Sequence, residues 1–103
     1  MDKSAVIDRV KQYADLVCNY FPVQKVILYG SYVKGTAGEH SDIDVAVVVD
    51  KIEGDFLESE AKLFNLTHAV DVSIEPILFE VDNYDPSGFF EEIQKTGEVI
   101  YSA

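Results

Sequence analysis

The chain is poor in cysteine, in basic residues and in long apolar runs, and each scarcity excludes something. Cys18 is the only cysteine, so no disulfide forms within the chain, which suits a reducing compartment. The longest apolar run, residues 45–49, is far shorter than the roughly 20 residues of a membrane span. Asp2, Ser4 and Asp8 interrupt any signal-peptide core. These features predict a cytoplasmic protein without a membrane partner.

Basic residues are the second scarcity. Eight Lys and Arg stand against 19 Asp and Glu, which gives a formal net charge of −11, and Arg9 is the only arginine. Affinity for nucleic-acid phosphates rests on clustered basic side chains, and here they are scattered. DNA and long RNA are therefore excluded as expected substrates. The acidity keeps a small protein soluble, and it also favours bound cations and a basic partner.

The pattern of apolar residues predicts one domain over residues 1–103, because the chain is long enough for a single core. Helical spacing, β-branched runs and turn residues give alternating helices and strands, and hence an α/β fold in which helices pack on a small mixed sheet. The expected helices are 4–20, 55–66 and 85–97, the expected strands are 25–29, 43–49, 69–79 and 99–101, and residues 31–41 form a helical turn and a loop.

Several local details follow from the same pattern. Ser4 is expected to cap the first helix. The helix at 55–66 is expected to bury its apolar side chains, namely Phe56, Leu57, Leu63 and Phe64. Pro76 indicates an edge strand or a bulge, because proline has no N–H to donate. The acidic residues 82–85 lack the spacing of a calcium loop and predict a turn.

Gly30-Ser31 is the first feature with chemical meaning. It directly follows a predicted strand and opens a predicted helical turn. Glycine permits a sharp turn and a close approach of the backbone, and exposed N–H groups with a serine hydroxyl suit a phosphate. A Gly-Ser pair after a strand is also common in ordinary turns, so the pair gains weight only from what surrounds it.

Asp42 and Asp44 are the second feature, at the start of the strongest predicted strand. Residues two apart on a strand point to the same face, so both carboxylates project together, about 7 Å apart at Cα. Two parallel acids repel each other and lose solvation unless a cation sits between them. Magnesium is suited to this place because it takes a few carboxylates together with phosphate oxygens of a substrate.

A third acid is expected from the strand predicted at 69–79. Asp71, Ser73 and Glu75 would share one face by the two-residue period. If this strand neighbours the one at 43–49, Asp71 completes a cluster of three carboxylates, and Glu75 is the alternative. Such a cluster with a phosphate-binding turn supplies the parts of a site for phosphoryl transfer with two metal ions, in which the third acid deprotonates or orients the acceptor.

These residues resemble a known family. A hydrophobic residue followed by Gly-Ser, ten further residues and then Asp-Ile-Asp-Val is similar to the DNA polymerase beta-like nucleotidyltransferase superfamily. The run LYGSYVKGTAGEHSDIDVAVVV looks closest to its smallest branch, the minimal nucleotidyltransferases encoded beside HEPN-domain proteins in bacteria and archaea. The resemblance is specific over this stretch, and the order of the elements and the later acid extend it.

The resemblance implies roles by position. Gly30 and Ser31 would bind the triphosphate, and Lys34 would pair with a phosphate oxygen as a point charge. Asp42 and Asp44 would hold two magnesium ions, and Asp71 would be the third acid of the cluster, with Glu75 as the alternative.

The resemblance also implies an activity. The chain would transfer a nucleoside monophosphate, AMP from ATP, to a tyrosine of a cognate HEPN toxin and so act as the antitoxin. Two alternatives remain open from sequence: an antitoxin that inhibits by occlusion without catalysis, and a transferase that modifies a small molecule such as an aminoglycoside. The nucleotide, the acceptor and the homo- or hetero-oligomeric state are not encoded in any residue pattern.

Overall fold

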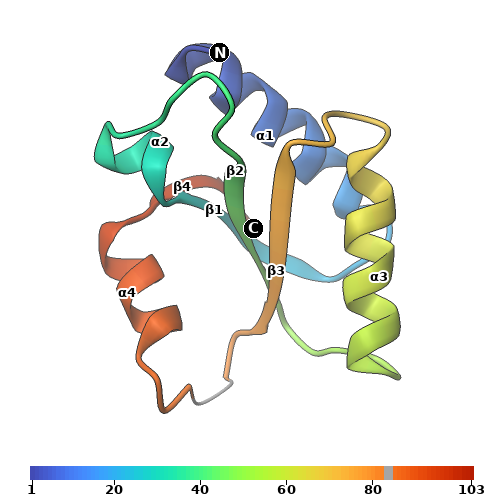
Figure 1. Ribbon diagram of the computed structural model, residues 1–103. Helices are drawn as coiled ribbons and strands as arrows, with labels where there is room; N and C mark the ends of the chain where they lie inside the picture. The colour runs from blue at the N-terminus through green and yellow to red at the C-terminus, as the bar shows by residue number, and fades with distance from the viewer. Residues whose placement is uncertain (83–84) are drawn as a thin grey trace.

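A four-stranded mixed sheet in the order β3-β2-β1-β4 organises the part of the chain that the structure describes, residues 1–82 and 85–103 (Figure 1). The structure is a computed structural model. Asn83 and Tyr84, in the turn expected at 82–85, lie outside the described residues. The elements in chain order are α1 (Lys3–Val17), β1 (Val23–Tyr29), α2 (Ser31–Lys34), β2 (Ile43–Val49), α3 (Phe56–Thr67), β3 (Ile74–Glu80), α4 (Phe89–Thr96) and β4 (Glu98–Ser102).

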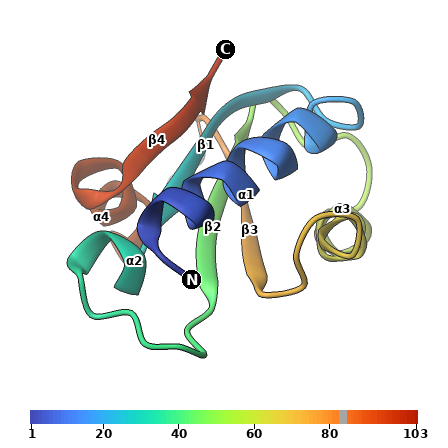
Figure 2. The same ribbon diagram turned by 90° about the horizontal axis from the view of Figure 1, so that it is seen from above.

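The pairing of the strands confirms the expected mixed α/β fold. β1 runs antiparallel to both β2 and β4, whereas β2 and β3 are parallel and are joined by the crossover helix α3. Figures 1 and 2 show α3 beside β3 at one end of the sheet and α4 beside β4 at the other. β2 lies between two partners, which explains why its sequence is an almost continuous β-branched run.

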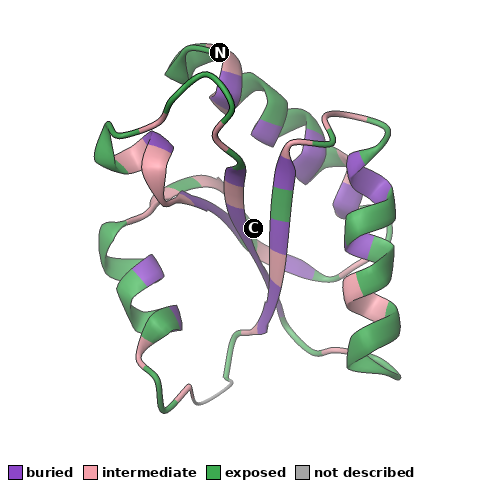
Figure 3. Ribbon diagram, in the orientation of Figure 1, coloured by how far each residue is buried: buried purple, intermediate pink, exposed green. Residues whose placement is uncertain are grey.

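Side chains from the two faces of the sheet form two apolar clusters. The larger cluster joins α1 and α3 to one face, with Tyr13, Leu28, Val45 and Leu63 fully buried in it. The smaller cluster packs α4 on the other face. Its buried members are Ile27, Ala46, Val48, Phe79, Phe90 and Ile93. In Figure 3 the strands are largely buried, while the outward helix faces are exposed.

Three expectations about local structure are wrong. The N-cap of α1 is Asp2, whose carboxylate accepts a hydrogen bond from the N–H of Ala5, and Ser4 already lies within the helix. In α3 the buried residues are Leu63, Leu66 and Thr67. Phe56, Leu57 and Phe64 are exposed instead, because only part of the α3 surface packs against the core.

The third correction concerns the strand expected at 69–79, which begins only at Ile74. Residues 69–73 form a turn, in which the Asp71 N–H donates to the Thr67 carbonyl and the Ile74 N–H to the Asp71 carbonyl. The Asp71 carboxylate also accepts a hydrogen bond from the Ser73 N–H at 2.8 Å. Such local bonds between an aspartate and the backbone compete with strand pairing, which is why the strand starts late.

β3 is an edge strand, as Pro76 indicated, and three positions along its outer edge offer no free N–H. Leu78 donates its N–H to the Glu60 carboxylate of α3 at 3.0 Å, Ile74 donates to Asp71, and Pro76 has no N–H. An edge with few free donors is less prone to pairing with another strand. As for the membrane, none of the described helices is both long and apolar enough to cross one.

A buried hydrogen bond ties α1 to α3, and it gives a first prediction. The Tyr13 hydroxyl donates to the Leu63 carbonyl at 2.8 Å, and the whole side chain is buried. Tyr13→Phe removes the donor while it keeps the ring, so we expect the free energy of unfolding to fall by about 1 kcal/mol in a urea titration. Tyr20→Phe, at an exposed tyrosine, is the matched control and should leave the unfolding midpoint unchanged.

Candidate active site

Three polar side chains lie side by side across the sheet. In the strand register, Asp44 of β2 is opposite Tyr29 of β1 and beside Glu75 of β3. Neighbouring strands are about 4.8 Å apart, so these positions form one row. Residues two further along β2 belong to the α4 cluster, which places the row on the α4 face of the sheet. The acid cluster expected from sequence therefore has two members fixed by strand pairing, Asp44 and Glu75.

Asp44 carries an unfavourable charge. It is half-buried, and its pKa is raised above the usual value of 3.8 first by burial, then by the nearby charges of Asp42 and Glu75. The ion pairs formed by the described residues are Lys3–Glu98 and Lys95–Glu91, and neither involves this row. Acids that repel one another at a partly buried position favour the binding of a cation.

Tyr29 is a member of the row that the sequence did not identify. Burial, followed by the charges of Asp44 and Glu75, raises its pKa to about 12. Its hydroxyl therefore keeps its proton near neutral pH and is a hydrogen-bond donor beside the carboxylates. The ring packs edge-to-face against Phe89 of α4, with 5.8 Å between centroids. Tyr29 thus connects the acidic row to the aromatic side chains of the helix.

Gly30 brings the turn after β1 against Asp44. Its φ of 79° and ψ of −144° lie in a region that is almost restricted to glycine. A Cβ atom at this position would overlap the Asp44 carboxylate oxygen Oδ2. Gly30 therefore allows both the positive-φ backbone conformation and the close approach to Asp44. The structure thus brings two of the sequence features, Gly30 and Asp44, into direct contact.

The remaining residues of the turn lie around this contact. Lys34, at the end of α2, is exposed and lines a cavity of about 170 Å³ together with Gly30, Tyr29 and Phe89. Ser31 is half-buried and lines a separate cavity of about 240 Å³ with residues of α1 and α2. Gly30 and Lys34 therefore open on the α4 side, whereas the Ser31 side chain belongs to a neighbouring hollow.

Asp71 lies outside the strand. It sits in the turn before β3, and its carboxylate accepts the N–H of Ser73. The expectation that Asp71 shares a strand face with Glu75 is wrong, because β3 begins at Ile74. Asp42 and Glu75, but not Asp71, are the acids that raise the pKa of Asp44. The strand register brings Glu75 rather than Asp71 beside the first two carboxylates.

The carboxylates around Asp44 fit a magnesium ion that binds together with a phosphate-containing substrate. Asp42, Asp44 and Glu75 offer only carboxylate oxygens, which are the ligands this ion prefers. Across residues 1–82 and 85–103, no three His, Cys, Asp or Glu side chains are drawn together tightly enough to hold an ion by themselves. Magnesium is commonly held by one or two carboxylates and completed by phosphate oxygens, so an incomplete protein cage agrees with this use.

The contact between Gly30 and Asp44 gives a second prediction. Gly35→Ala is the matched control, since Gly35 also has a positive φ, 77°, but has open space around its Cβ position. We expect Gly35→Ala to lower the free energy of unfolding by roughly 1–2 kcal/mol, the strain of a left-handed non-glycine residue. Gly30→Ala should lose clearly more in the same urea titration, because Asp44 must also move. Equal losses would contradict the close contact.

The raised pKa of Asp44 gives a third prediction, made in the absence of divalent cations. A carboxyl whose pKa is higher in the folded than in the unfolded state binds protons more tightly when folded, so its ionisation destabilises the fold as pH rises. Asp44→Asn should therefore be more stable than the natural chain at pH 7, and the gain should vanish as the pH falls below 3.8. Asp8→Asn, at an exposed carboxylate of α1, controls for net charge and should show no such pH-dependent gain. Urea titrations at both pH values measure these differences.

Comparison with solved structures supports the fold. A candidate nucleotidyltransferase from Sulfolobus solfataricus superposes with a TM-score of 0.71 at 17% identity, covering 97% of this chain and 83% of that one. A toxin-antitoxin structure with AMP-PNP gives a TM-score of 0.66 at 20% identity, covering 94% of this chain and 73% of that one. A Shewanella oneidensis complex of a tri-AMPylated HEPN toxin with its MNT antitoxin gives 0.61 at 17% identity, covering 98% and 73%.

The sequence itself places the chain in a family. Among curated protein sequences none matches this chain. The family model described as "Polymerase beta, Nucleotidyltransferase", however, matches residues 11–103, which is most of the chain and includes Gly30, Asp42, Asp44 and Glu75. The chain therefore belongs to the polymerase beta nucleotidyltransferase family.

Proposed function

We propose that this protein is a magnesium-dependent nucleotidyltransferase that moves AMP from ATP to a tyrosine hydroxyl on a partner HEPN toxin and thereby acts as its antitoxin. Family membership supports the reaction class. The solved structures with the same fold include a toxin-antitoxin pair with AMP-PNP and a tri-AMPylated HEPN toxin bound to an MNT antitoxin. These neighbours support the nucleotide and the partner, while the residues of this chain support the chemistry.

The single observation that carries the proposal is the contact of Gly30 with an uncompensated acidic row. Asp44 is flanked by Asp42 and Glu75, and the turn that begins at Gly30 packs directly on its carboxylate. A phosphate group held at that turn lies next to the acids, and the repulsion between the two is removed only if cations come between them. Asp42 and Asp44 would hold magnesium, and Gly30, Ser31 and Lys34 would hold the triphosphate.

The reaction exchanges one bond to phosphorus for another. The acceptor oxygen forms a bond to the α-phosphorus, the bond to pyrophosphate breaks, and the proton of the acceptor hydroxyl passes to a carboxylate. Magnesium, when bound, neutralises charge on the phosphate oxygens and on the leaving pyrophosphate. The work of this chain is to position both reactants and to accept the proton, which are the two main contributions of protein in such transfers.

We assign the third acidic role to Glu75 in preference to Asp71. The register of β2 and β3 holds Glu75 beside Asp44, whereas the carboxylate of Asp71 is engaged with the backbone of its own turn. Glu75 is also exposed, so an acceptor hydroxyl has access to it. Glu75, on the neighbouring strand, thereby takes the role that the resemblance implies for an aspartate.

A substitution series tests the function and the assignment together, and it is the fourth prediction. With ATP, magnesium and the partner encoded beside this gene, we expect the natural protein to add AMP to the partner, measured as a mass increase of the intact partner. Asp44→Asn and Glu75→Gln should each slow the transfer by about 10²–10⁴-fold, the usual contribution of a positioned acid or base. Asp71→Asn is the matched control and should retain most of the activity.

Other outcomes of the series have clear meanings. If the natural protein leaves the partner's mass unchanged yet still inhibits it, and if Asp42→Asn with Asp44→Asn also inhibits, the protein acts by occlusion and the catalytic proposal is wrong. If Asp71→Asn is inactive and Glu75→Gln is active, transfer occurs but the assignment of the third acid must be reversed.

A further inference from the structure

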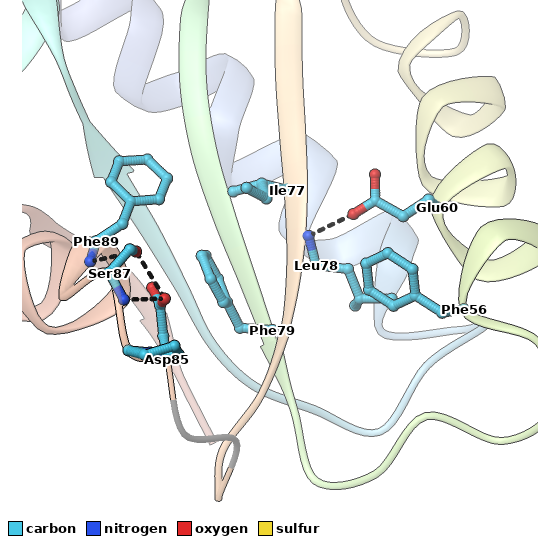
Figure 4. A pocket seen from close by; sticks show the side chains of 9 residues that line it. Phe56, Glu60, Ile77, Leu78, Phe79, Asp85, Ser87 and Phe89 are labelled. Atoms are coloured by element: carbon cyan, nitrogen blue, oxygen red, sulfur yellow. Dashed lines mark hydrogen bonds between the residues drawn. The ribbon is translucent and has the colours of Figure 1, made fainter.

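A hollow near the acidic row lies outside the residues assigned to nucleotide binding. It has a volume of about 500 Å³, which is in the range of ligand-binding pockets. Its floor is formed by Ile77 and Phe79 of β3, and Phe89 of α4 forms one wall (Figure 4). On the opposite side of β3, Phe56 and Glu60 reach it from α3.

The hollow adjoins the row of Tyr29, Asp44 and Glu75, although none of these three residues lines it. Ile77 and Phe79 follow Glu75 at the two-residue spacing of one strand face, so the floor begins directly beside that carboxylate. Phe89 packs on Tyr29 with 5.8 Å between ring centroids and on Phe79 with 6.3 Å. A molecule that rests on these rings therefore has one end at the acids.

The in-line geometry of phosphoryl transfer places the acceptor at this hollow. In phosphoryl transfer the attacking and leaving oxygens lie roughly in line through phosphorus. Gly30 is on the β1 side of Asp44, and Glu75 is on its β3 side. With pyrophosphate held at the Gly30 turn, the attacking hydroxyl approaches from the β3 side, where the hollow lies. This step rests on the proposed function.

The side chains that line the hollow indicate which kind of acceptor group it binds. Two phenylalanine residues are partly open to solvent, Phe89 being 43% and Phe56 47% exposed, which is typical of a surface that receives a partner. Phe79, in the floor, is stacked on Phe90 with 4.4 Å between ring centroids. Such rings favour another aromatic ring, in stacked or edge-to-face contact.

The carboxylates around the hollow further limit which partner residues can lie next to it. Glu60 and Asp85 place carboxylates at the rim. Hydrogen bonds from the Ser87 hydroxyl and from the Phe90 N–H lower the pKa of Asp85, which keeps it ionised. Carboxylates repel phosphate groups and attract basic side chains. Glu60 also occupies the Leu78 N–H of the β3 edge, so a partner binds there through side chains and not by adding a strand.

We propose that this hollow binds the tyrosyl side chain of the protein acceptor, presented on a segment with basic residues around the tyrosine, and delivers its hydroxyl to Glu75 and Asp44. The phenol ring lies on Phe79 and Phe89, and the flanking basic residues meet Glu60 and Asp85. The site thereby selects the acceptor by shape and charge before the chemistry begins.

A binding experiment that needs no catalysis tests the proposal. The whole chain, labelled with nitrogen-15, is titrated with the peptide Lys-Lys-Tyr-Lys-Lys and with the same peptide carrying serine in place of tyrosine. We expect the tyrosine peptide to shift the backbone amide signals of residues 56, 77, 79 and 89 and to bind at least several-fold more tightly than the serine peptide. Equal effects of the two peptides, or shifts at these residues with magnesium-ATP alone, would falsify the proposal; the second result would assign the hollow to the nucleobase.

Variants at exposed phenylalanines complete the test, and with the titration they form the fifth prediction. Phe89→Ala should weaken binding of the tyrosine peptide by about tenfold, the value of one lost aromatic contact with its buried area, and Phe56→Ala, across β3 from the phenol ring, should weaken it by less. Phe64→Ala is the matched control, since Phe64 is 41% exposed but lies outside the hollow. If all three variants bind the peptide alike, the hollow is not the acceptor site.

The two proposals fail in different ways. When the tyrosine peptide binds in the hollow but gains no AMP with ATP and magnesium, the proposed reaction is contradicted and the binding site stands. When the peptide gains AMP at the same rate in Phe89→Ala, Phe56→Ala and Phe64→Ala, the reaction stands and the hollow is excluded as the acceptor site.

Discussion

The crowding of carboxylates around Asp44 is the interaction on which the site depends. The fold fixes the surroundings of Asp44. The register of β2 with β3 holds Glu75 beside it, and the turn at Gly30 packs against its carboxylate oxygen. A fold that only needed stability would place a neutral residue there, since burial and repulsion both oppose the charge. Under the proposed function, magnesium and the triphosphate would offset this repulsion when they bind.

The scaffold keeps this crowding rigid. β2 is paired on both sides, and apart from Asp44 every one of its residues is buried. Tyr13 of α1 bonds to the backbone of α3, and Glu60 of α3 bonds to the backbone of β3, so the strand that carries Glu75 is tied to the rest of the core. A site on paired central strands holds its groups with less motion than one on loops.

Sequence predicted the order of the elements, but not all of their bounds and not their pairing. The boundaries of β2 follow from its β-branched run, and the turn at Gly30 and the aspartates at 42 and 44 follow from local rules. The sequence left the third acid open between Asp71 and Glu75, because the register of a parallel pair is set by tertiary packing. Nor does the two-residue period show that the Asp71 carboxylate bonds to Ser73 and delays the strand. The sequence likewise does not show that Tyr29 lies opposite Asp44, which follows only from the pairing of β1 with β2.

The negative charge of this protein acts both within the site and at long range. At short range the carboxylates of the row favour bound cations, and those on the rim of the aromatic hollow disfavour phosphate there. At long range a net charge of −11 speeds the encounter with a basic partner and slows that with nucleic acid, an effect that salt weakens. The same charge thus favours a cation-bound nucleotide at one end of the site and a basic protein segment at the other. Because Phe89 contacts both Tyr29 and the floor of the hollow, the nucleotide and the acceptor, bound as proposed, would meet across a single aromatic side chain, and binding of one would change the surroundings of the other.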